Sequence, residues 1–78
     1  MKPSSSSEPR PVTVRTVPIE LCQFIKFGGL AESGGAAKQA IAEGRVLLNG
    51  AIETQKSKKL TAGDRVTVED RTIVVRVN

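Results

Sequence analysis

The sequence contains no histidine, one cysteine, and only two aromatic residues, Phe24 and Phe27. These absences exclude disulfides within the chain, zinc sites built from thiolate and imidazole groups, and Ser-His or Cys-His nucleophile pairs. We therefore expect no cofactor, no metal and no enzymatic activity. Cys22 lies beside the apolar line of a predicted helix, so we expect a partly buried, inert thiol.

Long apolar runs are also absent. None approaches the length that spans a membrane, and the N-terminal residues offer no core for a signal peptide. The lack of a disulfide fits a reducing compartment, so we expect a cytoplasmic protein with no membrane contact. A chain of 78 residues has room for one domain, which we expect to be a monomer.

The basic residues are concentrated in one part of the chain. The net charge is +4, and residues 38–65 hold six of the twelve basic residues but three of the eight acidic ones. A local excess of this kind favours an anionic partner.

The N-terminal residues 1–11 combine a serine run with three prolines and have no apolar residue after Met1. They are predicted to be a disordered tail, which leaves residues 12–78 as the single domain. Residues 12–17 alternate apolar and polar side chains, and this period predicts an edge strand.

Two helices follow, predicted over residues 19–27 and 34–43. Pro18 suits the first turn of the first helix, and Gly28 and Gly29 can end it. Ser33 is the predicted N-cap of the second helix, and Gly44 its C-terminal stop. Apolar positions recur at the helical spacing i, i+3, i+4: Leu21, Phe24 and Ile25 in the first helix, and Ala37, Ala40 and Ile41 in the second.

The rest of the chain has the pattern of short strands. Residues 45–48 and 51–53 flank Asn49–Gly50, which is a strong signal for a hairpin turn. The polar residues 54–59 are predicted to form a loop, residues 62–64 a turn, and residues 65–69 and 72–77 two strands joined across Asp70–Arg71. The expected fold is α+β, with a two-helix hairpin packed on a small, mainly antiparallel β-sheet.

Several of these elements together resemble a known family. They are Gly29–Ser33, Ala37, Ile41–Val46, Asn49–Gly50 and Ala62–Val66. In this order they resemble the alpha-L RNA-binding motif, the unit named for small-subunit ribosomal protein S-four. The stretches Glu32–Lys38 and Gln55–Lys59 are similar to the small stand-alone YbcJ-like bacterial proteins, which share a Gly-Gly pair after the serine where the broader family usually has arginine.

The resemblance implies a non-catalytic module that holds structured RNA. The candidate RNAs are rRNA, tRNA and other RNA associated with the ribosome. The first amides of the helix over residues 34–43 lack intrahelical partners and favour an anion. Gly34 and Gly35 would leave those amides open to a phosphate, with Ser33 capping the helix or donating its hydroxyl and Lys38 one turn later. The alternative is that the two glycines only allow tight packing.

Other basic residues extend the expected RNA-binding site. Lys38 and Arg45 are seven residues apart and are predicted to form a basic strip, while Lys56, Lys58 and Lys59 place three cations within four positions. The alternative for each is an ordinary solvated charge. With so few aromatics we expect recognition by shape and phosphates rather than base stacking, and Phe24 belongs to the apolar line.

Two other classes of protein share parts of this pattern. Two short helices joined by a glycine turn are typical of helix-turn-helix DNA-binding proteins, but the second helix lacks the Arg, Asn or Gln at its start that would contact bases. Leu48–Gly50 followed by Gly63–Asp64 also occurs in β-grasp sulfur carriers, but this sequence ends without their Gly-Gly pair.

Overall fold

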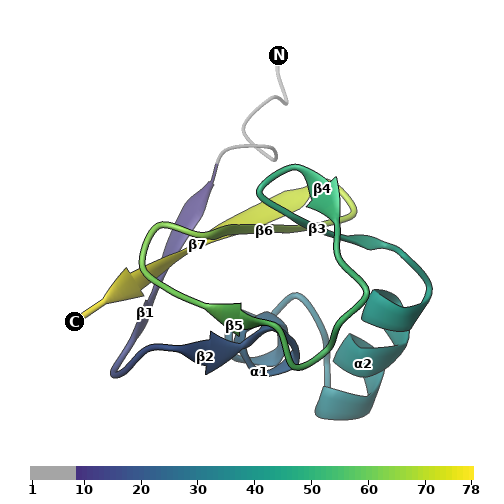
Figure 1. Cartoon of the computed structure of the whole chain (residues 1–78), viewed down its shortest axis with the longest axis horizontal. Helices are drawn as coiled ribbons and strands as arrows, with labels where there is room; N and C mark the ends of the chain where they lie inside the picture. Colours follow the sequence, from purple (N-terminus) through teal and green to yellow (C-terminus); the bar gives the residue numbers. More distant parts are fainter. Residues whose placement is uncertain (1–8) are drawn as a thin grey trace.

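The computed structural model describes residues 9–78, which form two helices and seven strands (Figure 1). The helices are α1 (Leu21–Phe27) and α2 (Gly34–Ala42). The strands are β1 (Arg10–Val14), β2 (Ile19–Glu20), β3 (Val46–Leu48), β4 (Ala51–Ile52), β5 (Lys59–Leu60), β6 (Arg65–Val68) and β7 (Arg71–Val77).

Five of the strands form one sheet in the order β1-β7-β6-β3-β4, and β2 and β5 form a second, two-stranded sheet. All pairings are antiparallel except that of β1 with β7, which is parallel. Both helices lie on the same side of the larger sheet (Figure 1). The predicted α+β class, a two-helix hairpin on a mainly antiparallel sheet, is confirmed.

The core lies between the helices and one face of the larger sheet. Alternate residues of β6 and β7 are buried, as the strand period requires. The helices contribute the apolar lines that their spacing predicted, and Phe24 is completely buried. Cys22 is a free, buried cysteine, as expected.

Strand β1 begins at Arg10, two residues before the predicted start. Arg10 and Pro11 pair with Ile73 and Val74, and the Arg10 Nη2 atom donates a hydrogen bond of 3.0 Å to the carbonyl of Gly28. These long-range contacts order two residues that composition assigned to the tail, so that boundary is wrong. Pro9 is exposed and belongs to no helix or strand, and residues 1–8 of the predicted tail lie outside the described residues.

The first helix also begins later than predicted, at Leu21. Ile19 and Glu20 instead pair with Leu60 and Lys59, so the segment predicted as a helix start and the end of the predicted loop become β2 and β5. Pro18 follows a cis peptide bond and lies before β2 rather than in a helix. The partner strand is about 40 residues away in sequence, and helical periodicity contains no information about it.

The turns agree well with their predictions. Asn49 and Gly50 have φ values of 53° and 89°, which places both in the left-handed region that a two-residue hairpin turn requires. The β6–β7 connection falls at Glu69–Asp70, one residue before the predicted position. Glu69 adopts a φ of 60° there, a conformation that its residue type does not favour.

Gly28 provides a test of the packing between α1 and the sheet. A Cβ atom there would lie 2.5 Å from Ile73 Cδ1 and 3.2 Å from the carbonyl oxygen of Phe24. We expect Gly28→Ala to lower the free energy of unfolding by about 1 to 3 kcal/mol through overpacking. The matched control is Gly34→Ala, where nothing lies within 4 Å, so stability should hold or rise by up to about 1 kcal/mol. Urea denaturation of both variants measures the difference, and equal stabilities would contradict the prediction.

Candidate functional site

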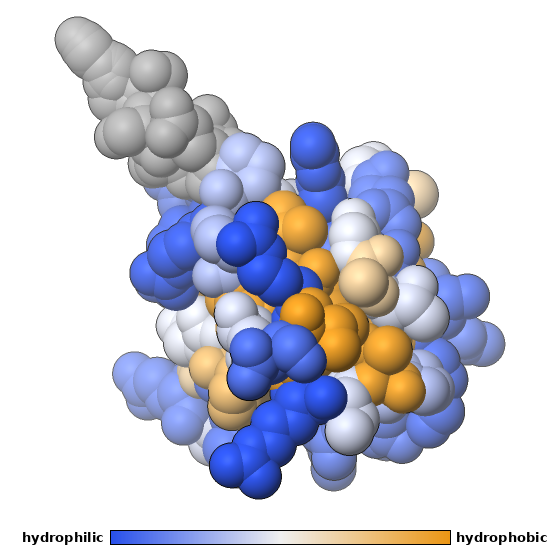
Figure 2. Space-filling model, turned by 90° about the vertical axis from the view of Figure 1, so that its left-hand side faces the viewer, coloured by the Kyte–Doolittle hydropathy of each residue, from blue (hydrophilic) through white to orange (hydrophobic). Residues whose placement is uncertain are grey.

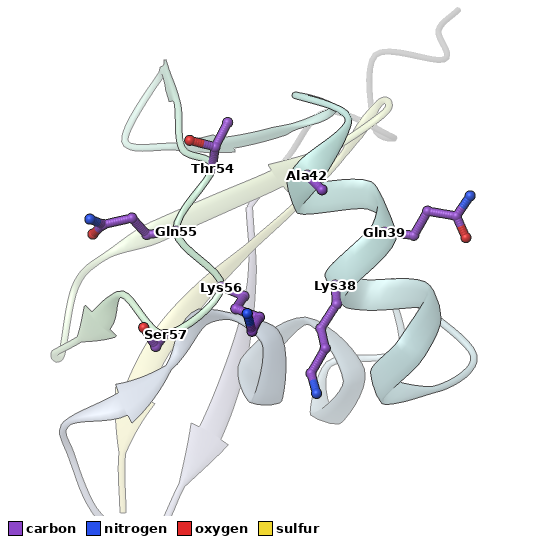
Figure 3. Close-up of a pocket in the computed structure, with 7 residues that line it drawn as sticks. All are labelled: Lys38, Gln39, Ala42, Thr54, Gln55, Lys56 and Ser57. Carbon is purple, nitrogen blue, oxygen red and sulfur yellow. The ribbon is translucent and has the colours of Figure 1, made fainter.

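An open groove of about 600 Å³ runs between α2 and the segment that connects β4 to β5. Its lining comes from two parts of the chain: Lys38, Gln39 and Ala42 from α2, and Thr54, Gln55, Lys56 and Ser57 from the connecting segment. Figure 3 shows the side chains of Lys38 and Lys56 on facing sides of this groove, while those of Gln39 and Gln55 point away from it. The lining contains two cations and no carboxylate, so the groove is suited to an anionic ligand.

The side of the groove formed by the β4–β5 segment is held in place by backbone hydrogen bonds to α1. The amide of Leu21 donates to the carbonyl of Lys58 at 2.8 Å, and the amide of Cys22 donates to the carbonyl of Lys56 at 3.1 Å. These first amides of α1 have no partner within the helix, so the segment acts as their acceptor. A further hydrogen bond of 3.1 Å joins the amide of Gln55 to Glu53 Oε2. The loop predicted from its polarity is therefore a fixed segment.

The first turn of α2 lies beside the groove. The Ser33 Oγ atom accepts a hydrogen bond of 3.1 Å from the amide of Ala36, which confirms the predicted N-cap. A Cβ atom would meet nothing within 4 Å at Gly34 and only Ser33 Oγ, at 3.9 Å, at Gly35. The alternative that these glycines serve tight packing is thus wrong. They leave the backbone of the first turn open.

Two of the predicted basic residues are engaged by carboxylates. The Nε atom of Arg45 lies 2.9 Å from Glu43 Oε1, and its Nη1 atom lies 3.1 Å from Glu69 Oε2. The Nζ atom of Lys59 lies 3.1 Å from Glu20 Oε2. All of these groups are at least one third exposed, so each ion pair contributes little stability and can exchange with another anion. The expected strip from Lys38 to Arg45 is therefore partly neutralised at Arg45.

Three lysines of the predicted site remain exposed and make no ion pair with any of residues 9–78: Lys38, Lys56 and Lys58. The structure brings the first two together at one groove. Sequence reasoning missed the polar lining that accompanies them, namely Gln39, Thr54, Gln55 and Ser57. Their polarity was visible in the sequence, but the position of Thr54, Gln55 and Ser57 opposite α2 follows from the hydrogen bonds between their segment and α1.

The described residues offer neither a metal site nor a membrane-spanning helix. Residues 9–78 contain no group of three or more Cys, Asp or Glu side chains placed to hold a metal ion. Neither helix of the described part has the length and apolarity needed to cross a membrane.

Comparison with known proteins identifies the class. The S4 domain family model matches residues 12–76, which is most of the chain, and the chain belongs to this family. The predicted resemblance is confirmed, and the helix-turn-helix and β-grasp alternatives are set aside.

Individual proteins of known sequence or structure are similar to most of this chain. YbcJ of Escherichia coli (strain K12), named as a candidate RNA-binding protein, is 46% identical over 57 residues, covering 73% of this chain and 81% of YbcJ. RlbA of Bacillus subtilis (strain 168), named as a candidate ribosome maturation protein, is 37% identical over 59 residues, covering 76% of this chain and 83% of RlbA. The solution structure of Escherichia coli YbcJ, described as containing an alpha-L motif involved in RNA binding, matches with a TM-score of 0.66 at 40% identity, covering 88% of this chain and 89% of YbcJ.

The cap of α2 can be tested without any ligand. Ser33→Ala removes the acceptor for the Ala36 amide and should lower the free energy of unfolding by about 1 kcal/mol. Ser33→Asp is the matched control, since aspartate caps about as well as serine and should leave stability nearly unchanged. Thermal melts followed by circular dichroism measure both, and an Ala variant as stable as the parent would contradict the assigned cap.

Proposed function

We propose that this protein is a non-catalytic RNA-binding module that holds structured RNA by its phosphate backbone in the groove between α2 and the β4–β5 segment. The observation that carries the proposal is the pair of lysines, Lys38 and Lys56, across a groove whose lining has no carboxylate. The membership in the S4 domain family and the RNA-related names of its relatives support it.

The groove and the start of α2 form one phosphate-binding surface in this proposal. Lys38 lies one turn after Gly34 and Gly35, whose backbone is open to solvent. The helix dipole adds a partial positive charge at this end, so a phosphate is favoured by the amides and by the ammonium group together. Ser33 contributes through its cap, which fixes the direction of the first turn. Lys58, exposed beside the same segment, adds a third cation.

Arg45 and Lys59 take a secondary role. Each would contact RNA by exchanging a carboxylate partner for a phosphate, at Glu43 and Glu69 for Arg45 and at Glu20 for Lys59. Because an existing ion pair is lost in the exchange, the new phosphate contact adds less binding free energy than a contact from an unpaired lysine. The main affinity therefore comes from Lys38, Lys56 and Lys58, the lysines of the proposed site that make no ion pair with the described residues.

The target class follows from the groove and from the relatives. A groove that contacts phosphates recognises the shape of a folded or double-helical RNA rather than its base sequence. The ribosome maturation name of the Bacillus relative favours ribosomal RNA. The protein would act on it as a cytoplasmic monomer, without a cofactor and without catalysing a reaction on the RNA.

Charge reversal in the groove tests the proposal. We expect Lys38→Glu and Lys56→Glu each to weaken binding to a blunt-ended RNA duplex by roughly 10- to 100-fold, the range for losing a charged hydrogen bond. Each should also flatten the dependence of log affinity on log salt by about 0.7 to 0.9, the value for one phosphate contact. Fluorescence anisotropy over a salt series measures both quantities.

The control for net charge is Arg71→Glu, because Arg71 is an exposed residue of β7 outside the groove lining. It should weaken binding far less than either groove variant. Equal losses for all three variants would show that only the overall charge matters, and the groove would be rejected as the site.

Gly35→Asp tests the open start of α2. The side chain meets no packed neighbour, and a carboxylate in the first turn interacts well with the helix dipole, so stability should hold or rise by up to about 1 kcal/mol. The same carboxylate occupies the position proposed for phosphate, so RNA affinity should fall by roughly 10-fold or more. Gly35→Ala is the matched control and should retain binding. An Asp variant that is folded and binds like the Ala variant would exclude this part of the site.

A further inference from the structure

A second hollow, of about 510 Å³, lies on the other side of α1 from the groove, where the end of β1 meets the start of β2. Its lining includes the apolar residues Val14, Pro18, Ile19 and Phe27. Phe27 is 63% exposed, whereas Phe24 on the same helix is completely buried. Helical spacing separates the two rings, since Phe24 belongs to the apolar line of α1 and Phe27 lies outside it.

The face around this hollow is distinctive. On the side of the molecule that contains the C-terminal residue, apolar side chains gather at the surface and are bordered by hydrophilic ones (Figure 2). Asn78 lines the hollow and lies on this side. Phe27 lines the hollow and is largely exposed, and an exposed apolar surface bordered by polar groups is typical of a binding site.

The polar groups at the rim indicate what the hollow binds. Thr13, Thr16 and Gln23 offer hydroxyl and amide groups that can both donate and accept hydrogen bonds. Arg15 is exposed and makes no ion pair with any described residue. No side chain of the lining is a carboxylate. The hollow therefore combines the exposed ring of Phe27, groups that can hydrogen-bond the edge of a planar ligand, and a cation for the negative charge of that ligand.

We infer that this hollow holds one unpaired nucleobase of the bound RNA, stacked on the ring of Phe27, with Arg15 contacting the adjoining phosphate. Aromatic side chains stack unpaired bases in this manner, and every base has a face suited to it. A second copy of the chain fits less well, because a symmetric contact would bring the Arg15 cations of both copies to the same interface. This inference rests on the proposed function and adds to it a preference for RNA in which a duplex carries an unpaired nucleotide.

The proposed base site adds one contact to the expected recognition by shape and phosphates. That expectation followed from the small number of aromatics. A single exposed ring can stack one base, and the apolar residues Pro18 and Ile19 line the hollow beside it. The groove and the hollow would then divide recognition between the backbone of a duplex and one base outside it.

The experiment compares two RNA probes, a blunt-ended duplex and the same duplex with one bulged 2-aminopurine. The parent protein should bind the bulged RNA roughly 5- to 100-fold more tightly, the range for one stacked base, and the fluorescence of 2-aminopurine should change on binding. Phe27→Leu should abolish that preference while leaving affinity for the blunt duplex unchanged. Phe27→Tyr retains a ring and should preserve the preference.

Ile52→Ala is the matched control, because Ile52 is 65% exposed but lies on β4, outside the hollow. It should behave like the parent with both probes. Equal binding of the two probes by the parent, or a preference that survives in Phe27→Leu, would overturn the base site while the groove remains. If the parent bound neither probe, the proposed function would fail and the base site with it.

Discussion

The hydrogen bonds between the first amides of α1 and the carbonyls of Lys56 and Lys58 are the constraint on which the candidate site depends. They satisfy the open end of a helix, and at the same time they fix the segment that faces α2. Since the two sides of the groove are more than ten residues apart in sequence, no local rule would bring Lys38 and Lys56 together. A structural requirement of α1 thus determines where the cations of the groove lie.

Features with local causes were predictable from the sequence. The cap at Ser33 depends on a side chain and an amide three residues later, and the Asn49–Gly50 turn depends on two adjacent residues that tolerate positive φ. The apolar lines of both helices and the alternation of β6 and β7 follow from periods of 3.6 and 2. The family resemblance used the same local elements, and for this reason it identified the fold correctly.

Features with long-range causes were not predictable. Arg45 and Lys59 looked like the other basic residues, but Glu69 and Glu20 lie 24 and 39 positions away from them and neutralise them only in the folded chain. Strands β2 and β5 have two residues each, too few to produce a periodic signal.

The parallel pairing of β1 with β7 has a consequence for the order in which the protein can form during its synthesis. The first strand of the described chain pairs only with the last, and each pair in that ladder is separated by 63 residues. While the chain is being made, β1 is synthesised before its partner, and its backbone groups hydrogen-bond to water until β7 is available. Closure of the sheet is therefore a late event that requires β7, and the Arg10 bond to Gly28 forms only when β1 docks.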